Sequence, residues 1–435
     1  MKPMKMEWVV SLSLLALTAI AGALVPWAAP VVTGGPINPG DVAWMLTATG
    51  LVLLMTPGLS FFYGGMVQRK NVISTMLQSF ISMGVLSIVW VVVGFSLAFG
   101  DSIGGLIGRP DVFFLFRHVG GATHPLLAPT IPLALFAMFQ LKFAIITPAL
   151  ITGSFAERVR FSSYILFITL FSIFIYCPLA HWTWHPDGFL HKWGVLDFAG
   201  GTVVHMSAGF AALAGAIYMG RRKVHLASEH TKPANIPFVL LGTGMLWFGW
   251  FGFNAGSALA ANDTATLAFI NTNTASAAAM LAWVFFDAAR GRRPAALGAC
   301  VGAVVGLVAI TPAAGYVPVG SAIFIGALAA VISNLAVHWK TRSTLDDTLD
   351  VFPCHGVGGI VGMLATGVFA DKGGLIHGDA TLFIRHVEAT CIVGMYSFWG
   401  SYFLYMVTDA LITIRVRPEQ EEAGLDLSQH DESFA

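Results

Sequence analysis

Residues 72–99 read VISTMLQSFISMGVLSIVWVVVGFSLAF, a run that contains no acidic or basic residue. A helix of about 20 such residues crosses the hydrocarbon core of a bilayer. The polar residues Gln68–Asn71 precede the run, and a longer polar stretch from Gly100 to Pro129 follows it. The run therefore predicts a membrane-spanning helix with a connection at each end.

The whole chain has the composition of a membrane protein. Of its 435 residues, 56% are apolar and 11% are charged, whereas about 25% of a typical soluble domain is charged. The formal net charge is zero, so no overall field would attract nucleic acid or acidic partners. We interpret the four cysteines as small core residues, because they lie in apolar stretches without metal-ligand or disulfide spacing: Cys177, Cys300, Cys354 and Cys391. The solvent of this chain is lipid.

The first 35 residues have the order of a secretory signal. Lys2 and Lys5 precede an apolar run from Trp8 to Val25, and prolines and small residues follow. This order predicts a signal peptide or leader over residues 1–35, cut after Ala23. The alternative is an additional membrane helix, for which the run is nearly long enough.

Eleven apolar runs follow this leader, each long enough for a membrane helix. They begin near residues 42, 72, 132, 162, 199, 236, 266, 295, 319, 353 and 380. The predicted fold is therefore an all-α polytopic membrane protein with eleven transmembrane helices. We expect a transmembrane domain over residues 36–414 and a polar tail over residues 415–435.

Basic residues fall in alternate connections between these runs. One set of connections carries only Arg109, Arg117, Lys192 and Lys372. The other set carries fifteen: Arg69, Lys70, Arg158, Arg160, Arg221, Arg222, Lys223, Lys232, Arg290, Arg292, Arg293, Lys340, Arg342, Arg415 and Arg417. Lysine and arginine collect on the cytoplasmic side. The pattern predicts a multi-pass protein of the inner (plasma) membrane, with a cytoplasmic C-terminus and with its first mature helix starting outside.

Eleven helices with an outside start divide into five, five and one. Two halves with an odd number of helices run in opposite directions, which predicts two inverted five-helix repeats plus one C-terminal helix. His205 lies inside the fifth predicted helix and His355 inside the tenth. The two histidines therefore take equivalent positions in the two halves.

An ionisable group inside a membrane is costly and by default marks a pathway. Either histidine alone is also explained as a hydrogen-bonded core residue, but two at matching positions favour a shared site. Facing imidazoles can share a proton while the pair stays uncharged, and such a pair can hydrogen-bond a small neutral base. A metal is disfavoured, because no Cys, Asp or Glu lies at ligand spacing beside His205 and His355.

Aromatic residues mark three further places. Phe143 lies on an apolar face of the third predicted helix, and Phe253 and Ser257 lie one turn apart on the sixth. Trp184 is expected in an extracellular loop, among several histidines and another tryptophan. Ordinary packing explains the helical aromatics, and an interfacial aromatic belt explains the loop. A cation–π surface for a small cation is the functional alternative.

Six strings, in this order, carry a resemblance to a known family: Phe62-Tyr-Gly-Gly65, Phe143-Ala-Ile-Ile-Thr-Pro148, Ala156-Glu-Arg158, Asp197-Phe-Ala-Gly-Gly-Thr-Val-Val-His205, Gly249-Trp-Phe-Gly-Phe-Asn-Ala-Gly-Ser257 and His355-Gly-Val-Gly-Gly-Ile-Val-Gly362. From about residue 42 to the tail, the chain resembles bacterial ammonium transporters of the Amt family, within the Amt/Mep/Rh superfamily. The resemblance implies a homotrimer in the lipid bilayer, with one pore through each subunit. It implies a transporter of ammonium or ammonia rather than an enzyme, without metal or cofactor.

The resemblance also implies roles for single residues. Trp184, Ser257 and Phe143 match the family's outer ammonium-binding site, and Asp197 matches an aspartate that supports it. Phe143 and Phe253 match the gate, and His205 and His355 match the twin histidines of the pore. Ammonium would lose its proton at the gate and cross as ammonia, because a bare cation in a low-dielectric pore is expensive. The proton would follow a separate route or pass along the histidines, and the sequence leaves both open.

Two features depart from this pattern or extend it. Lys142 lies beside Phe143, where it either snorkels to the outer interface or faces the vestibule and repels ammonium. The connection His181–His191 is rich in histidine, which predicts sensitivity to external pH.

The tail, residues 415–435, resembles the family's cytoplasmic regulatory region, which in relatives supports regulation by a PII-type protein. A disordered acidic tail is the alternative. Other functions left open are an ammonium sensor that signals through this tail and an Rh-like NH3 or CO2 channel.

Overall fold

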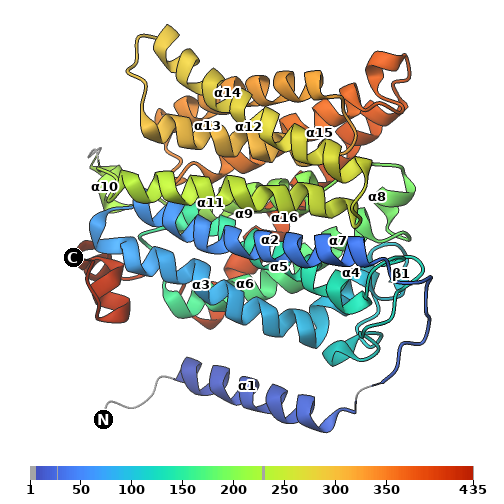
Figure 1. Ribbon diagram of the computed structural model, residues 1–435. Coiled ribbons are helices and arrows are strands. Elements are labelled where there is room, and N and C mark those ends of the chain that lie inside the picture. The colour runs from blue at the N-terminus through green and yellow to red at the C-terminus, as the bar shows by residue number, and fades with distance from the viewer. Residues whose placement is uncertain (1–5, 27, 228–230, 435) are drawn as a thin grey trace.

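The computed structural model describes residues 6–26, 28–227 and 231–434. Lys2 and Lys5 of the predicted leader and Ala435 of the tail lie outside these ranges. The described chain is mostly helical (Figure 1), with one small antiparallel pair of strands, β1 (Ser102–Ile103) and β2 (Ile107–Gly108). Ser102 pairs with Gly108 in this hairpin. The prediction of an all-α membrane fold is therefore confirmed in its main feature.

The helices of the first half follow the predicted runs closely. They are α1 (Met6–Leu24), α2 (Pro39–Met66), η1 (Arg69–Asn71), α3 (Val72–Val89), η2 (Trp90–Gly94), α4 (Phe95–Phe99), η3 (Phe114–Phe116), α5 (Leu133–Phe155), α6 (Phe161–Phe171), η4 (Ser172–Tyr176), α7 (Cys177–Trp184), α8 (Phe189–Lys192), η5 (Gly201–Met206) and α9 (Ser207–Met219). Several of these are continuous rods. For example, α3, η2 and α4 form one helix with a π-helical turn inside it.

The second half has the same character. Its helices are α10 (Lys223–Leu226), α11 (Ile236–Ala255), η6 (Gly256–Ala258), α12 (Asp263–Ala289), α13 (Ala296–Ile310), α14 (Val319–Thr341), η7 (Phe352–Val357), α15 (Gly358–Phe369), η8 (Leu375–His377), α16 (Thr381–Leu411), α17 (Pro418–Ala423) and η9 (Asp426–His430). Within the described ranges, ten helices are long and apolar enough to cross a membrane, and α1 is one of them. The predicted runs near residues 295 and 380 are also helical, as α13 and α16.

Small residues let the helices of the bundle pack backbone against backbone. Gly242 on α11 lies so close to α2 that a Cβ placed there would clash with the backbone nitrogen of Phe62. In lipid, such close approach replaces hydrophobic burial as a source of helix association. Figure 1 shows α2 and α11 side by side near the middle of the molecule. Residues of both helices line the narrow inner cavity described below.

Helix α1 lies apart from the bundle (Figure 1), and none of its residues is buried. Its ring contact with the bundle is between Trp8 and Phe161, whose centroids are 6.3 Å apart. The segment that follows α1 runs along the loop after α4, where His118 Nδ1 lies 2.6 Å from the carbonyl oxygen of Ala29. The prediction of a cleavable leader remains a prediction.

The tail folds against the end of the bundle that also holds α10, opposite the end with β1 and α8 (Figure 1). The Asp426 carboxylate accepts hydrogen bonds from the backbone N–H groups of Ile73 (3.1 Å) and Ser74 (2.8 Å), at the start of α3. The Leu425 N–H donates to Asn71 Oδ1 at 2.8 Å. Leu425 and Asp426 are buried. The alternative of a disordered tail is therefore wrong for its described residues, 415–434.

Candidate functional site

The predicted outer residues meet around one cavity of about 400 Å³. Phe143 reaches it from α5, Trp184 from α7, Asp197 from the connection before η5, and Ser257 from η6. Tyr316, which the sequence analysis did not single out, lines it as well. The four predicted residues, which are spread over more than a hundred positions of the sequence, therefore line one cavity, which we call the vestibule.

Trp184 sits at the end of a helix, and its prediction as a loop residue was wrong. Helix α7 continues from η4 through Trp184, because Cys177–Trp184 has no glycine and its proline lies in the first turn, where a missing N–H is tolerated. The indole Nε1–H donates to the carbonyl oxygen of Asp197 at 3.1 Å. This bond fixes the ring, so the face of the indole, with its negative quadrupole, is the part free to meet a cation.

Ser257 offers lone pairs to the same cavity. Its hydroxyl donates to the carbonyl oxygen of Phe253, one turn earlier, at 2.9 Å. A hydroxyl has one hydrogen and two acceptor positions. Because the hydrogen is already used, the oxygen can act only as an acceptor toward a guest. A small N–H donor is therefore the complementary guest for the vestibule.

Two phenylalanines close the bottom of the vestibule. The rings of Phe143 and Phe253 are 4.3 Å apart between centroids, with an angle of 34° between their planes. Trp184 meets Phe143 edge-on at 5.7 Å. Both phenylalanines are buried. Phe143 lines the vestibule, and Phe253 lines a second, inner cavity. The predicted gate pair thus lies between two spaces.

The inner cavity is narrow and almost wholly apolar. It has a volume of about 10 Å³, close to the smallest space that holds one water-sized molecule. Among its lining residues only two are ionisable, His205 and His355; the others are Met55, Leu59, Phe62, Ile146, Leu150, Val204, Leu246, Trp250, Phe253 and Val304. The two histidines predicted to share a site therefore do so.

The histidines face each other through one pair of ring nitrogens. His205 Nδ1 and His355 Nδ1 are 3.3 Å apart, and the ring planes differ by 22° at a centroid distance of 5.4 Å. Both rings are buried. His205 also stacks on Trp250 at 5.4 Å, with 19° between the planes.

Thr311 determines how the histidines share their protons, and the sequence analysis missed it. Its hydroxyl donates to the carbonyl oxygen of Leu307 at 2.8 Å and accepts from Trp250 Nε1 at 2.9 Å. His205 Nε2 lies 3.3 Å from the same oxygen. Since the one hydroxyl hydrogen is used, His205 Nε2 carries a proton and donates it to Thr311. Then His205 Nδ1 accepts, and His355 Nδ1 donates.

Each histidine follows an aspartate that caps its helix. Asp197 accepts from the N–H groups of Gly200 (2.8 Å), Gly201 (2.6 Å) and Thr202 (2.7 Å) at the start of η5. This π-helical segment carries His205. Asp197 therefore holds the backbone at the start of η5, and it also lines the vestibule. Its supporting role for an ammonium site remains a prediction.

Asp347 is the counterpart of Asp197 in the second half. Its carboxylate accepts from the N–H groups of Val351 (3.1 Å) and Phe352 (2.8 Å), where the π-helical segment η7 begins. Asp347 precedes His355 by eight residues, as Asp197 precedes His205. This repeated spacing is visible in the sequence and could have identified Asp347. Burial raises the pKa of the Asp347 carboxyl to about 6.

Lys142 is buried, with 7% of its surface exposed. It is not among the described residues that line the vestibule.

The histidines of the neighbouring connection differ from one another. His181 is fully buried between Ser102 and the carbonyl oxygen of Ala98, whereas His191 is exposed and lines the vestibule. Of His181, His185 and His191, only His191 is among the described residues that line the vestibule.

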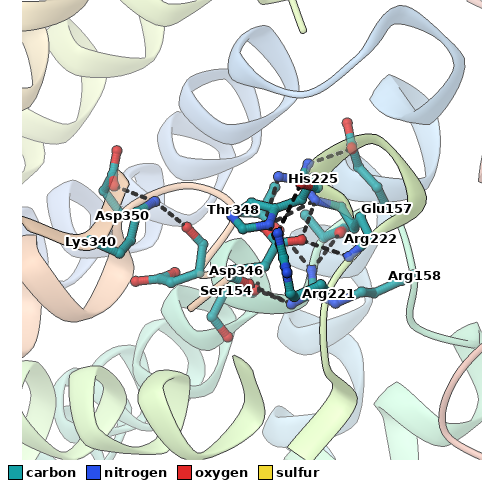
Figure 2. Close-up of polar contacts among 12 residues, drawn as sticks. Ser154, Glu157, Arg158, Arg221, Arg222, His225, Lys340, Asp346, Thr348 and Asp350 are labelled. Carbon is teal, nitrogen blue, oxygen red and sulfur yellow. Dashed lines mark hydrogen bonds and ion pairs between the residues drawn. The ribbon is translucent and has the colours of Figure 1, made fainter. Parts of the chain in front are cut away.

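A buried ionic cluster ties the connections at the tail end of the bundle (Figure 2). Arg222 pairs with Glu157 at 2.6 Å and with Asp346 at 2.9 Å. Arg158 donates to the hydroxyl of Thr348 at 2.7 Å and to the carbonyl oxygen of Asp346 at 2.6 Å. Burial acts to raise the pKa of Asp346, but the hydrogen bonds and charge of Arg222 and Arg158 outweigh it and hold that pKa well below its usual range.

The tail lies beside this cluster, since Glu421 lines one pocket together with Glu157 and Arg222. Glu421 accepts from the Lys223 N–H at 2.7 Å and pairs with Arg415 at 2.9 Å. Lys340 forms a separate pair with Asp350 at 2.6 Å, close to the start of η7 (Figure 2). The tail therefore contacts the loop that holds α10, through the hydrogen bond between the Lys223 N–H and Glu421. Within the part of the chain that the structure describes, no group of three or more His, Cys, Asp or Glu could hold a metal ion.

The fold and the site define a polytopic membrane protein in which the rings of Phe143 and Phe253 lie between a vestibule and a narrow inner cavity lined by two histidines. Residues 43–434 match the Ammonium Transporter Family. An ammonium transporter of Aquifex aeolicus is 46% identical over 403 residues, which cover 91% of this chain and 93% of that relative. The chain therefore belongs to the ammonium transporter family, and its function is ammonium transport.

Solved structures agree with this assignment. Mep2 of Saccharomyces cerevisiae matches with a TM-score of 0.83 and 34% identity, over 88% of this chain and 89% of that one. A structure described as a sensor Amt protein matches with a TM-score of 0.83 and 31% identity, over 90% of this chain and 98% of that one. The fold is shared across both.

Proposed function

We propose that the protein binds NH4⁺ in the vestibule, removes its proton at the Phe143–Phe253 gate and conducts NH3 past His205 and His355. The observation that carries this proposal is the contrast between the two cavities. The vestibule offers the indole of Trp184 and the hydroxyl of Ser257, while the inner cavity holds about 10 Å³ and is apolar apart from the two histidines.

Desolvation explains why the proton must leave. A cation moved into a low-dielectric space without a counter-charge costs several kcal/mol or more, and no acidic residue lines the inner cavity among the residues described. Ammonia avoids most of this cost because it is neutral. A potassium ion cannot lose its charge, so the same barrier excludes it. Selectivity then needs no ring of carbonyl ligands.

The proton arrangement of the histidines supports conduction of a neutral base. With His205 Nε2 donating to Thr311 and His355 Nδ1 donating to His205 Nδ1, the Nε2 atom of His355 is left as an acceptor. Ammonia has three N–H donors and one lone pair, so such an acceptor can hold it in transit. The proton follows a separate route or passes along the pair, and both remain part of the proposal.

The topology we propose has eleven membrane-spanning helices after the leader, arranged as two inverted repeats plus α16. The matched pairs Asp197–His205 and Asp347–His355, each with a π-helical segment, support the repeats. The basic connections support a cytoplasmic tail in a protein of the inner or plasma membrane. A homotrimer with one pore per subunit completes the assembly.

We also propose that the tail is regulatory. Its contacts with Ser74, Asn71 and Lys223 tie it to the connections under the pore, so a PII-type protein that displaced it would act on those connections. A sensor of ammonium is the second candidate function. The same packed tail and the likeness to a sensor Amt protein favour it. An Rh-like NH3 or CO2 channel remains the nearest variant of the transporter.

The test is an ammonium pulse applied to proteoliposomes that contain the wild-type protein, with current and internal pH recorded together. A saturable, ammonium-dependent current supports a transporter that moves net charge. Alkalinisation without current supports passive conduction of ammonia. Binding of ammonium with neither signal would overturn transport and favour the sensor.

A further inference from the structure

His386 is a fully buried histidine that the proposed pathway does not use. It lies on α16, outside both the vestibule and the inner cavity as their described linings define them. Its Nε2 atom is 3.0 Å from the backbone nitrogen of Leu196, and its Nδ1 atom is 2.7 Å from the carbonyl oxygen of Met363. An N–H can only donate and a carbonyl can only accept. Nδ1 therefore carries the proton, and Nε2 accepts.

One of the two hydrogen bonds of His386 holds the vestibule lining at Leu196, and the other holds α15 at Met363. Leu196 is followed by Asp197, whose carbonyl oxygen fixes the indole of Trp184 and whose carboxylate caps the segment that carries His205. Met363 lies on α15, which continues from the segment that carries His355. One side chain thus connects the vestibule wall to the helix of the second histidine.

The His386 side chain is also packed tightly against the backbone of α15. A Cβ placed on Gly367 of α15 would stand 3.2 Å from His386 Cβ and 3.3 Å from its Cγ. Helices α15 and α16 therefore approach closely at this point, with the ring between them. In such packing, the two hydrogen bonds have a fixed geometry.

We propose that His386 is a positioning residue for the outer ammonium site. It holds Leu196 so that the Asp197 carbonyl and carboxylate keep Trp184 and the start of η5 in place. The inference deepens the proposed function and rests on ammonium binding in the vestibule. It predicts that loss of the acceptor at Nε2 weakens ammonium recognition more than it slows conduction.

Two substitutions separate this role from simple packing. His386→Leu fills most of the volume but offers neither donor nor acceptor, so the part-buried Leu196 N–H loses its partner. His386→Gln offers a carbonyl acceptor and an NH2 donor, and it should restore both bonds. Tyr405→Phe is a matched control, since Tyr405 on the same helix donates to the carbonyl oxygen of Ala211 at 3.1 Å, on α9 rather than on the vestibule wall.

The experiment measures transport against ammonium concentration and hydrogen exchange of the peptide around Leu196, for the full-length protein. We expect His386→Leu to raise the apparent KM about tenfold, because the Leu196 N–H is left without its acceptor, with Vmax within about twofold. Exchange at Leu196 should rise in the same variant. Both readouts should return toward wild type in His386→Gln and stay unchanged in Tyr405→Phe.

An unchanged KM with unchanged exchange in His386→Leu would overturn the inference. So would equal impairment of the Leu and Gln variants, or a fall in Vmax and thermal stability at constant KM. Absence of ammonium transport and binding in the wild type would instead contradict the proposed function. The exchange readout would show in that case whether His386 holds Leu196, so the two failures are distinguishable.

Discussion

His205 and His355 meet through their Nδ1 atoms, 3.3 Å apart, although 150 residues separate them in sequence. Only one of these two nitrogens can carry a proton if the pair is to be neutral and hydrogen-bonded. Thr311 settles which one, because it accepts from His205 Nε2 and so leaves His205 Nδ1 as the acceptor. The proton pattern of the lumen therefore originates at Thr311, directly after the end of α13 and outside both histidine segments.

Thr311→Val should test this arrangement. The substitution keeps the shape of the side chain but removes the acceptor of Trp250 Nε1 and His205 Nε2. We expect the transport rate to fall about tenfold, as for a lost buried hydrogen bond, with little change in apparent KM. Ammonium uptake by proteoliposomes measures both quantities. Thr311→Ser, which keeps the hydroxyl, should behave as wild type, and equal rates for Val and Ser would contradict the assignment.

Ser257→Ala should weaken ammonium recognition. The hydroxyl oxygen of Ser257 is available only as an acceptor, and a hydrogen bond from a charged donor contributes about 1.5–3 kcal/mol. The apparent KM for ammonium should therefore rise about tenfold or more, while Vmax changes little. Concentration dependence of uptake measures this, with Ser257→Thr as the control that keeps the acceptor. A KM equal to that of wild type would remove Ser257 from the site.

Arg222→Met should destabilise the protein strongly. The change leaves Glu157 and Asp346 buried without their partner, and breaking a buried ion pair from one side costs about 3–5 kcal/mol. Thermal unfolding in detergent should show a clearly lower Tm. The matched control is Lys192→Ala, which breaks an exposed pair with Asp187 and should cost about 0–1 kcal/mol. Similar Tm shifts in the two variants would refute the role assigned to the cluster.

Asp347 should make stability depend on pH. Burial raises its pKa to about 6, from an ordinary value of 3.8. A raised pKa means that the folded state prefers the protonated carboxyl, so this contribution is full below about pH 4 and is lost as the pH rises through about 6. The loss should reach about 3 kcal/mol. Between pH 4 and 7, the Tm of wild type should therefore fall relative to Asp347→Asn, and parallel curves would contradict the prediction.

The helices were predictable because their signal is local. The length and apolar composition of each run predict a membrane helix without information from distant residues. Helices α3, α5 and α11 therefore begin close to where the sequence predicts them. The pairing of His205 with His355 was predictable for a different reason, since the predicted inverted repeat gives them equivalent positions, and such positions are expected to converge. The resemblance to a family located Trp184 and Ser257, which local patterns left ambiguous.

The remaining features depend on contacts that no local pattern records. Thr311 reaches His205 across 106 positions, and Arg222 reaches Asp346 across 124. His386 accepts a hydrogen bond from a backbone N–H 190 residues away. The local sequence around a single histidine in an apolar helix does not indicate that partner. Asp347 is the exception, because its spacing to His355 repeats that of Asp197 to His205 and could have been found by comparing the halves.

The central claim is that the substrate crosses the inner cavity as neutral ammonia, held by the two histidines. The most direct test is current through proteoliposomes under separate ammonium and potassium gradients, for wild type and for His205→Ala/His355→Ala. The account predicts an ammonium response without potassium current in wild type. It predicts potassium current in the double variant, because removal of two imidazoles opens the lumen to water and hydrated ions. Potassium current in wild type, or intact ammonium transport with potassium exclusion in the double variant, would contradict it.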